Sequence, residues 1–202
     1  GALAAVRELG WRLAVAANTG SVDALPALAA EAQGLGFELA PVRVGDNRYL
    51  LLRDGSGDGR GLLVLRFGGT ASRVILQAPH AFHDRHSGEI ALALWEASSF
   101  PALQVNTRHR YTAGRAGDGG GAGASTDLAK RDDTWFHALM LGLLDAVDRP
   151  FVVQIHGFGR STVEDADVDV IASGGAYPRP EVVRAFADTL RELTPATGVL
   201  VY

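Results

Sequence analysis

The stretch RVILQAPHAFHDRHSGEIALALWEASSFPALQVN, residues 73–106, contains a strand, a helix and a second strand in succession. Residues 73–78 are a short apolar run that stops before Pro79, which predicts a strand. Residues 87–98 have the apolar periodicity of a helix, and residues 102–106 form a second apolar run. This order is typical of a βαβ unit, in which strands of one sheet are covered by helices.

The alternation continues on both sides of this stretch. Downstream, the pattern predicts helices over 126–147 and 179–193 and strands over 151–156, 168–172 and 198–202. Upstream, it predicts a helix over 21–33, an extended segment over 37–44, and strands over 49–53 and 61–67 that form a meander with 73–78. We therefore expect a three-layer α/β sandwich with a mixed, mostly parallel sheet. Residues 1–202 are expected to form one domain, in which 1–72 are the helix and meander part and 73–202 the core with the functional site.

The composition excludes several classes of protein. The chain has 202 residues, of which 47% are hydrophobic, with a net charge of −4 and no cysteine. Without cysteine it has no disulfides, no thiol nucleophile and no thiolate-bound metal. The sequence contains no basic block of the kind that indicates nucleic-acid binding. No stretch approaches the roughly 20 apolar residues of a membrane span. The compartment stays open, with a cytoplasmic protein favoured over a processed, secreted form.

Two histidines lie at the carboxyl ends of predicted strands. His80 comes after the strand 73–78, and His156 ends the strand 151–156. Glu89 lies in the first turn of the helix that begins near Ser87, within reach of the strand tip. Because ligands of such sheets bind beyond the carboxyl ends of the strands, these three side chains can converge. Two histidines and a carboxylate would hold Zn²⁺ and leave one coordination position for water, as in zinc hydrolases.

Other interpretations of the histidines stay open. His86 and Glu89 form a rival pair at i, i+3 on one helix face. His83 is expected to contact the metal ligands rather than the metal itself, or to face a substrate. Any of these histidines could also be an ordinary side chain of a surface loop.

Two cationic clusters are candidates for substrate binding. Arg108, His109 and Arg110 follow the strand 102–106, where they favour an anionic ligand or a developing oxyanion. Lys130 and Arg131 lie early in the helix 126–147, against its macrodipole, which indicates a partner anion. A solvated turn and an exposed helix face are the respective alternatives.

Four short motifs suggest a family. They are Ala78-Pro-His80, Ser87-Gly-Glu89-Ile-Ala, Asp127-Leu-Ala-Lys130 and Gln154-Ile-His156-Gly157. Through them, residues 73–202 resemble the N-formylglutamate amidohydrolase and poly-γ-glutamate hydrolase group, itself similar to zinc carboxypeptidases. The resemblance implies a phosphorylase/hydrolase-like α/β sandwich, a zinc ion held by His80, Glu89 and His156, and hydrolysis of an amide or peptide bond next to a carboxylate.

The resemblance also implies a cationic residue that binds the carboxylate of a small substrate, for which Arg110, Lys130 and Arg131 are candidates. Arg108 is a further candidate from the cluster after the strand 102–106, and we expect His109 or Arg110 to stabilise the oxyanion. Lys130 replaces an arginine of the family's Asp-Leu-Asn-Arg motif and lacks the bidentate fork. The family's general base is a Glu on a strand near the C-terminal end. The given sequence stops at Tyr202, at about the position where that strand would begin. Either the general base lies outside this sequence, or the protein is a metal- or carboxylate-binding domain without catalysis, which is the alternative function.

Overall fold

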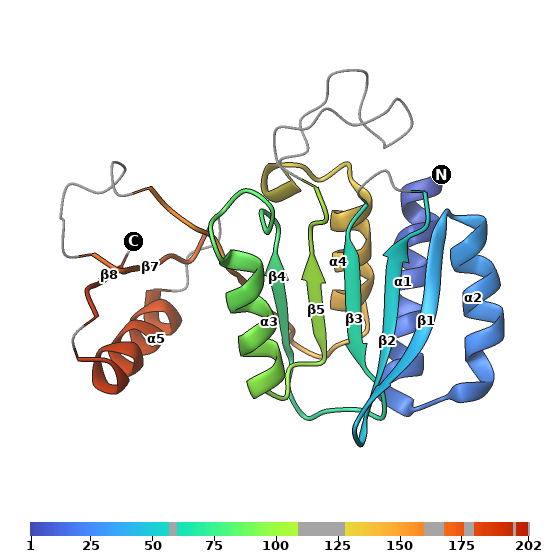
Figure 1. The fold of residues 1–202 in the computed structure, drawn as a ribbon, viewed down its shortest axis with the longest axis horizontal. Coiled ribbons are helices and arrows are strands. Elements are labelled where there is room, and N and C mark those ends of the chain that lie inside the picture. Colours follow the sequence, from blue (N-terminus) through green and yellow to red (C-terminus); the bar gives the residue numbers. More distant parts are fainter. Residues whose placement is uncertain (57–59, 109–127, 160–167, 176–179, 196, 202) are drawn as a thin grey trace. The chain divides into compact units, whose positions relative to one another are not determined.

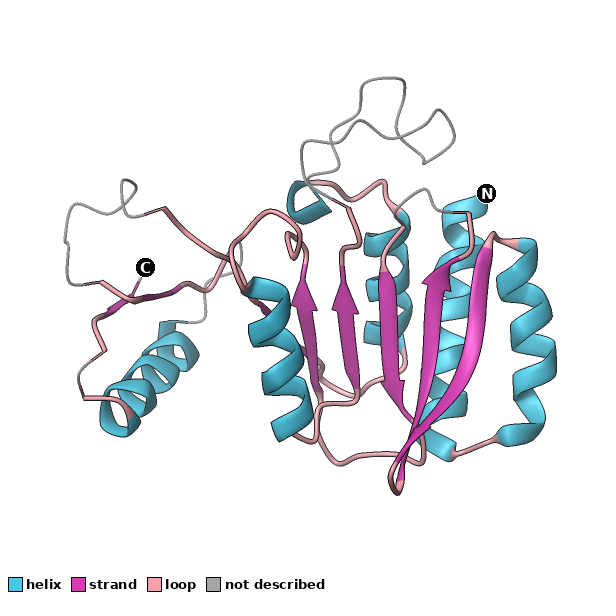
Figure 2. Ribbon diagram, in the orientation of Figure 1, coloured by secondary structure: helices cyan, strands magenta, loops and turns pink. Residues whose placement is uncertain are grey.

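The computed structural model describes residues 1–56, 60–108, 128–159, 168–175, 180–195 and 197–201. They divide into two compact units, residues 1–157 and residues 158–202. The first unit contains α1 (Ala2–Thr19), η1 (Val22–Ala24), α2 (Leu25–Gly34), β1 (Phe37–Val44), β2 (Asn47–Asp54), β3 (Leu62–Arg66), β4 (Val74–Ala78), α3 (Ser87–Ala97), β5 (Ala102–Val105), η2 (Leu128–Lys130), α4 (Trp135–Asp145) and β6 (Phe151–Gln154). Figures 1 and 2 show these elements.

The first unit is built on a six-stranded sheet with the order β1-β2-β3-β5-β4-β6. β1, β2 and β3 form an antiparallel meander, and β5 pairs antiparallel with β3. β4 is parallel to both β5 and β6. The predicted α/β fold with a mixed sheet is confirmed. The prediction that 73–78 continues the meander is wrong, because the chain returns through α3 and places β5 between β3 and β4.

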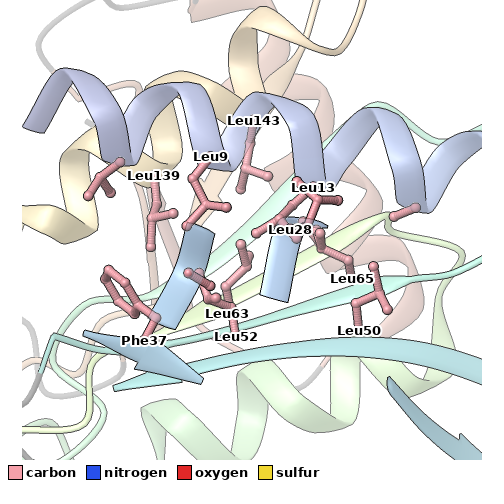
Figure 3. Close-up of a cluster of buried hydrophobic side chains, with 14 of the residues drawn as sticks. Leu9, Leu13, Leu28, Phe37, Leu50, Leu52, Leu63, Leu65, Leu139 and Leu143 are labelled. Atoms are coloured by element: carbon pink, nitrogen blue, oxygen red, sulfur yellow. The ribbon is translucent and has the colours of Figure 1, made fainter. Parts of the chain in front are cut away.

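Helices cover both faces of this sheet, which gives three layers (Figure 1). Side chains alternate between the two faces, since successive residues of a strand point in opposite directions. Leu63 and Leu65 belong to a core with α1, α2 and α4, whereas Val64 belongs to a second core beneath α3. Figure 3 shows the first core, in which leucines of α1 and α4 meet leucines of β2 and β3.

α1 and α4 approach each other at backbone distance. A Cβ atom built on Gly142 of α4 would lie 2.1 Å from the carbonyl oxygen of Arg7 and 2.7 Å from the backbone nitrogen of Trp11. Only glycine fits there. The start of α4 is fixed by Thr134, whose side chain accepts a hydrogen bond from the backbone of His137 at 3.2 Å. The first turn of α4 therefore has a defined place against the sheet.

The described residues of the second unit contain a smaller βαβ arrangement. β7 (Val170–Ala172) pairs in parallel with β8 (Val199–Val201), and α5 (Pro180–Leu193) connects them. These three elements lie in the segments where the sequence predicts two strands and a helix. The structure contains two compact units, and the expectation that residues 1–202 form a single domain stays a prediction. None of the described helices is long and apolar enough to cross a membrane.

Candidate metal centre

The ends of β4 and β6 bring two histidines to one edge of the sheet. The two strands are parallel, with Gln77 opposite Gln154. The pairing extends one residue further, because the backbone nitrogen of Ile155 donates to the carbonyl oxygen of Gln77 at 2.8 Å. His80 and His156 follow directly, and the distance between their Nδ1 atoms is 3.2 Å. The prediction that these two side chains converge is confirmed.

A tight turn after β4 adds a carboxylate to the two histidines. The backbone nitrogens of His83 and Asp84 both donate to the carbonyl oxygen of His80, each at 2.8 Å. This i, i+4 bond is that of one helical turn, so the side chains of His80 and Asp84 lie on the same side. Asp84 Oδ2 is 3.3 Å from His80 Nδ1 and 3.5 Å from His156 Nδ1.

The three atoms form a triangle of the size that a tetrahedral metal ion requires. Ligand atoms at about 2.0–2.2 Å from zinc in tetrahedral geometry lie about 3.3–3.6 Å from one another. The sides of this triangle measure 3.2, 3.3 and 3.5 Å. His80, Asp84 and His156 could therefore hold a metal ion.

The triangle is buried on one side and accessible on the other. The side chains of His80 and Asp84 are 5% and 7% exposed, whereas that of His156 is 37% exposed. The backbone nitrogen of Gly157 donates to Asp84 Oδ2 at 3.0 Å and holds this carboxylate in place. A Cβ atom on Gly157 would lie 3.0 Å from Asp84 Cβ, so this close approach favours glycine. A small molecule would reach the triangle from the side of His156.

Models of known protein families, curated proteins and solved structures gave no significant match to this chain. The resemblance to amidohydrolases therefore stays a prediction, and the interpretation of the site depends on its geometry.

Glu89 does not join His80 and His156 in this group. Its carboxylate lies 2.6 Å from His86 Nδ1, and the two side chains are 79% and 56% exposed. The rival His86–Glu89 pair thus forms on the surface, and Asp84 provides the carboxylate at the site. The sequence contains a signal for this, the His80-x-x-x-Asp84 spacing, but it becomes informative only if residues 80–84 form a helical turn. His83 lies in this turn, with its side chain exposed.

Arg108 lies at the same edge of the sheet, past the end of β5. Its backbone nitrogen donates to the side-chain oxygen of Asn106 at 2.9 Å. The fully buried amide of Asn106 in turn donates to the carbonyl oxygen of Pro79 at 2.8 Å, which ties the end of β5 to the residue before His80. Arg108 Nη1 is buried without a hydrogen-bond partner in the described part of the chain.

The structure says less about the other cationic candidates for substrate binding. Arg131 forms a fork with Asp133, with distances of 2.8 and 2.6 Å. This hydrogen bonding raises the pKa of Arg131 and lowers the pKa of Asp133. Lys130 ends η2 and Arg131 follows it, whereas α4 begins only at Trp135. The prediction that both residues lie early in the long helix, against its macrodipole, is therefore wrong. His109 and Arg110 lie outside the described residues, so their roles as oxyanion and carboxylate ligands stay predictions.

Proposed function

We propose that this protein is a zinc-dependent hydrolase of an amide or peptide bond next to a carboxylate. The observation that carries the proposal is the triangle of His80 Nδ1, His156 Nδ1 and Asp84 Oδ2, with sides of 3.2–3.5 Å. Two imidazoles and a carboxylate suit zinc, and three protein ligands leave its fourth position for water or substrate. The accessible side at His156 supports this assignment.

Zinc bound here would lower the pKa of a water molecule and polarise the substrate carbonyl. The residues of the chain fix the geometry. His80 and Asp84 are held in the interior by the turn that joins them, and the backbone of Gly157 orients the Asp84 carboxylate. Because Asp84 is assigned as a ligand, the general base has to be another residue.

Arg108 supports a substrate that carries a carboxylate. An unpaired buried N–H group costs free energy, about 1–3 kcal/mol and more for a charged group. The oxygen of an anionic ligand would satisfy Arg108 Nη1, which has no partner among the described residues. This favours substrates such as N-acyl amino acids, glutamyl compounds and small peptides. Arg110, Lys130 and Arg131 stay further candidates for the same task.

The proposal can be tested with zinc-loaded protein and N-formylglutamate, N-acetylglutamate and a γ-glutamyl dipeptide as substrates. The readout is the release of a free amine. We expect zinc-dependent turnover that is lost in Asp84→Ala, and a raised KM in Arg108→Gln with unchanged zinc content. The matched control is Glu89→Gln, which changes a carboxylate outside the triangle and should leave both values as in the wild type.

Two results would contradict the proposal. Turnover that persists after removal of zinc would exclude a metal-dependent hydrolase. Zinc and carboxylate binding without turnover of any of these compounds would instead identify a binding domain that does not catalyse hydrolysis.

A further inference from the structure

Three of the four glutamines of the chain stand side by side in the sheet. Gln104 of β5 and Gln154 of β6 are the register partners of Gln77, which lies between them on β4. Gln154 Nε2 donates to Gln77 Oε1 at 2.8 Å, and Gln77 Nε2 donates to Gln104 Oε1 at 2.7 Å. We call these three residues the glutamine ladder. Gln77 and Gln104 are almost completely buried.

The buried end of the ladder sets the direction of every hydrogen bond in it. Gln104 Nε2 donates to the backbone carbonyl oxygen of Phe136, in the first turn of α4, at 2.7 Å. A carbonyl oxygen only accepts, so Gln104 must present its NH₂ group to α4 and its oxygen to Gln77. The same reasoning orients Gln77 and then Gln154. Each amide donates toward α4 and accepts from the side of β6.

The other end of the ladder meets His156. Gln154 Oε1 lies 3.3 Å from His156 Nε2. Since this oxygen only accepts, His156 Nε2 must carry a proton to form the bond. In a neutral imidazole the other nitrogen, Nδ1, then carries a lone pair and no proton. His156 Nδ1 is the atom that completes the triangle with His80 and Asp84.

We propose that the glutamine ladder positions His156 as a metal ligand, by keeping its proton on Nε2 and directing the Nδ1 lone pair at the metal. The inference depends on the metal centre of the proposed function and adds the residues that prepare it. A hydrogen bond to the second ring nitrogen commonly fixes the tautomer and orientation of a metal-binding histidine. Here the orienting residue Gln154 is itself fixed, because Gln77 and Gln104 link it to the backbone of α4.

The ladder could instead serve only to satisfy buried amide groups, and two substitutions of Gln154 separate these roles. Gln154→Leu removes both the donor to Gln77 and the acceptor for His156. Gln154→Glu also removes the donor to Gln77 but keeps an oxygen that can accept from His156 Nε2. If the ladder positions His156, Gln154→Leu should weaken zinc binding about 10–100-fold, the usual range for partners of metal ligands. Gln154→Glu should bind zinc as the wild type does, although it is less stable.

The control is Gln33→Leu, which changes the remaining glutamine, an exposed residue of α2. Zinc affinity is measured by competition with a chelator, and stability by urea unfolding of the zinc-free proteins. A structural role alone predicts that Gln154→Leu and Gln154→Glu lower stability and leave zinc affinity unchanged, or change it equally. Either result would overturn the inference without affecting the proposed function.

A second measurement needs no metal. The ring nitrogens of ¹⁵N-labelled histidine are recorded by NMR above the usual histidine pKa of about 6.5, with His156 assigned by comparison with His156→Ala. We expect a proton on Nε2 in the wild type and in Gln154→Glu, and a mixture of tautomers in Gln154→Leu. A proton on Nδ1 in the wild type would refute the inference even if the protein binds zinc. Absence of zinc binding in the wild type would refute the proposed function instead.

Discussion

Two histidine–carboxylate pairs lie within ten residues of each other and differ in almost every respect. His80 and Asp84, at i, i+4, are 3.3 Å apart, with side chains 5% and 7% exposed. His86 and Glu89, at i, i+3, are 2.6 Å apart and 56% and 79% exposed. The shorter contact is thus the solvated one. A short contact alone does not make a candidate metal site, whereas a buried pair joined by a third side chain from another strand could hold a metal ion.

The largest expected difference between the two pairs is in zinc affinity. Asp84→Ala removes one of the three proposed ligands, and we expect zinc affinity to fall more than about 100-fold, because even the partners of ligands are typically worth 10–100-fold. Glu89→Ala should change the affinity by less than a factor of two. Both values are measured by isothermal titration of zinc into the protein. If the larger loss occurred in Glu89→Ala, the roles of the two pairs would be reversed.

The second difference concerns the stability that zinc confers. An ion that binds only the folded protein stabilises it by about 2.7 kcal/mol at 100 times its Kd. We expect this gain in the wild type and in Glu89→Ala, its absence in His156→Ala, and its reversal by a chelator. Urea unfolding with and without zinc measures the effect. An equal gain in His156→Ala would show that zinc binds elsewhere.

A smaller effect is expected from the glycine that contacts Asp84. Gly157→Ala places a Cβ atom 3.0 Å from Asp84 Cβ, so Asp84, which bears the carboxylate, has to shift slightly to accommodate it. We expect zinc affinity to fall by about tenfold. The matched control is Gly34→Ala in α2, where a Cβ atom meets nothing within 4 Å. Unchanged affinity in Gly157→Ala would mean that the position of Asp84 does not depend on this contact.

The smallest effect is expected at the exposed pair itself. Glu89→Gln should change the free energy of unfolding by no more than about 0.5 kcal/mol, because exposed ion pairs are weak. Urea unfolding of the zinc-free protein measures this. A loss of several kcal/mol would show that the His86–Glu89 pair has a structural role that its exposure does not indicate.

The sequence predicts much of this edge of the sheet because regular elements have regular patterns. Three short apolar runs become β4, β5 and β6, and one segment with helical periodicity becomes α3. Each element lies where the pattern predicts it. Parallel strands then place His80 and His156 together. The order of β3, β5 and β4 was predicted incorrectly as a continued meander, since apolar runs alone do not say which strands become neighbours.

The sequence names the wrong carboxylate, Glu89 in place of Asp84, for a different reason. Glu89 lies in a regular helix, where its position can be inferred from periodicity. Asp84 lies in an irregular turn, and its side chain reaches His80 only because two backbone nitrogens donate to the carbonyl oxygen of His80. No periodicity of the sequence encodes this turn.

The most direct test of the account is the location of zinc in crystals of the wild-type protein, from anomalous diffraction at the zinc absorption edge. We predict one ion at about 2.0–2.2 Å from His80 Nδ1, His156 Nδ1 and Asp84 Oδ2. An ion bound by His86 and Glu89, or crystals grown with zinc that contain no ion at the triangle, would contradict it.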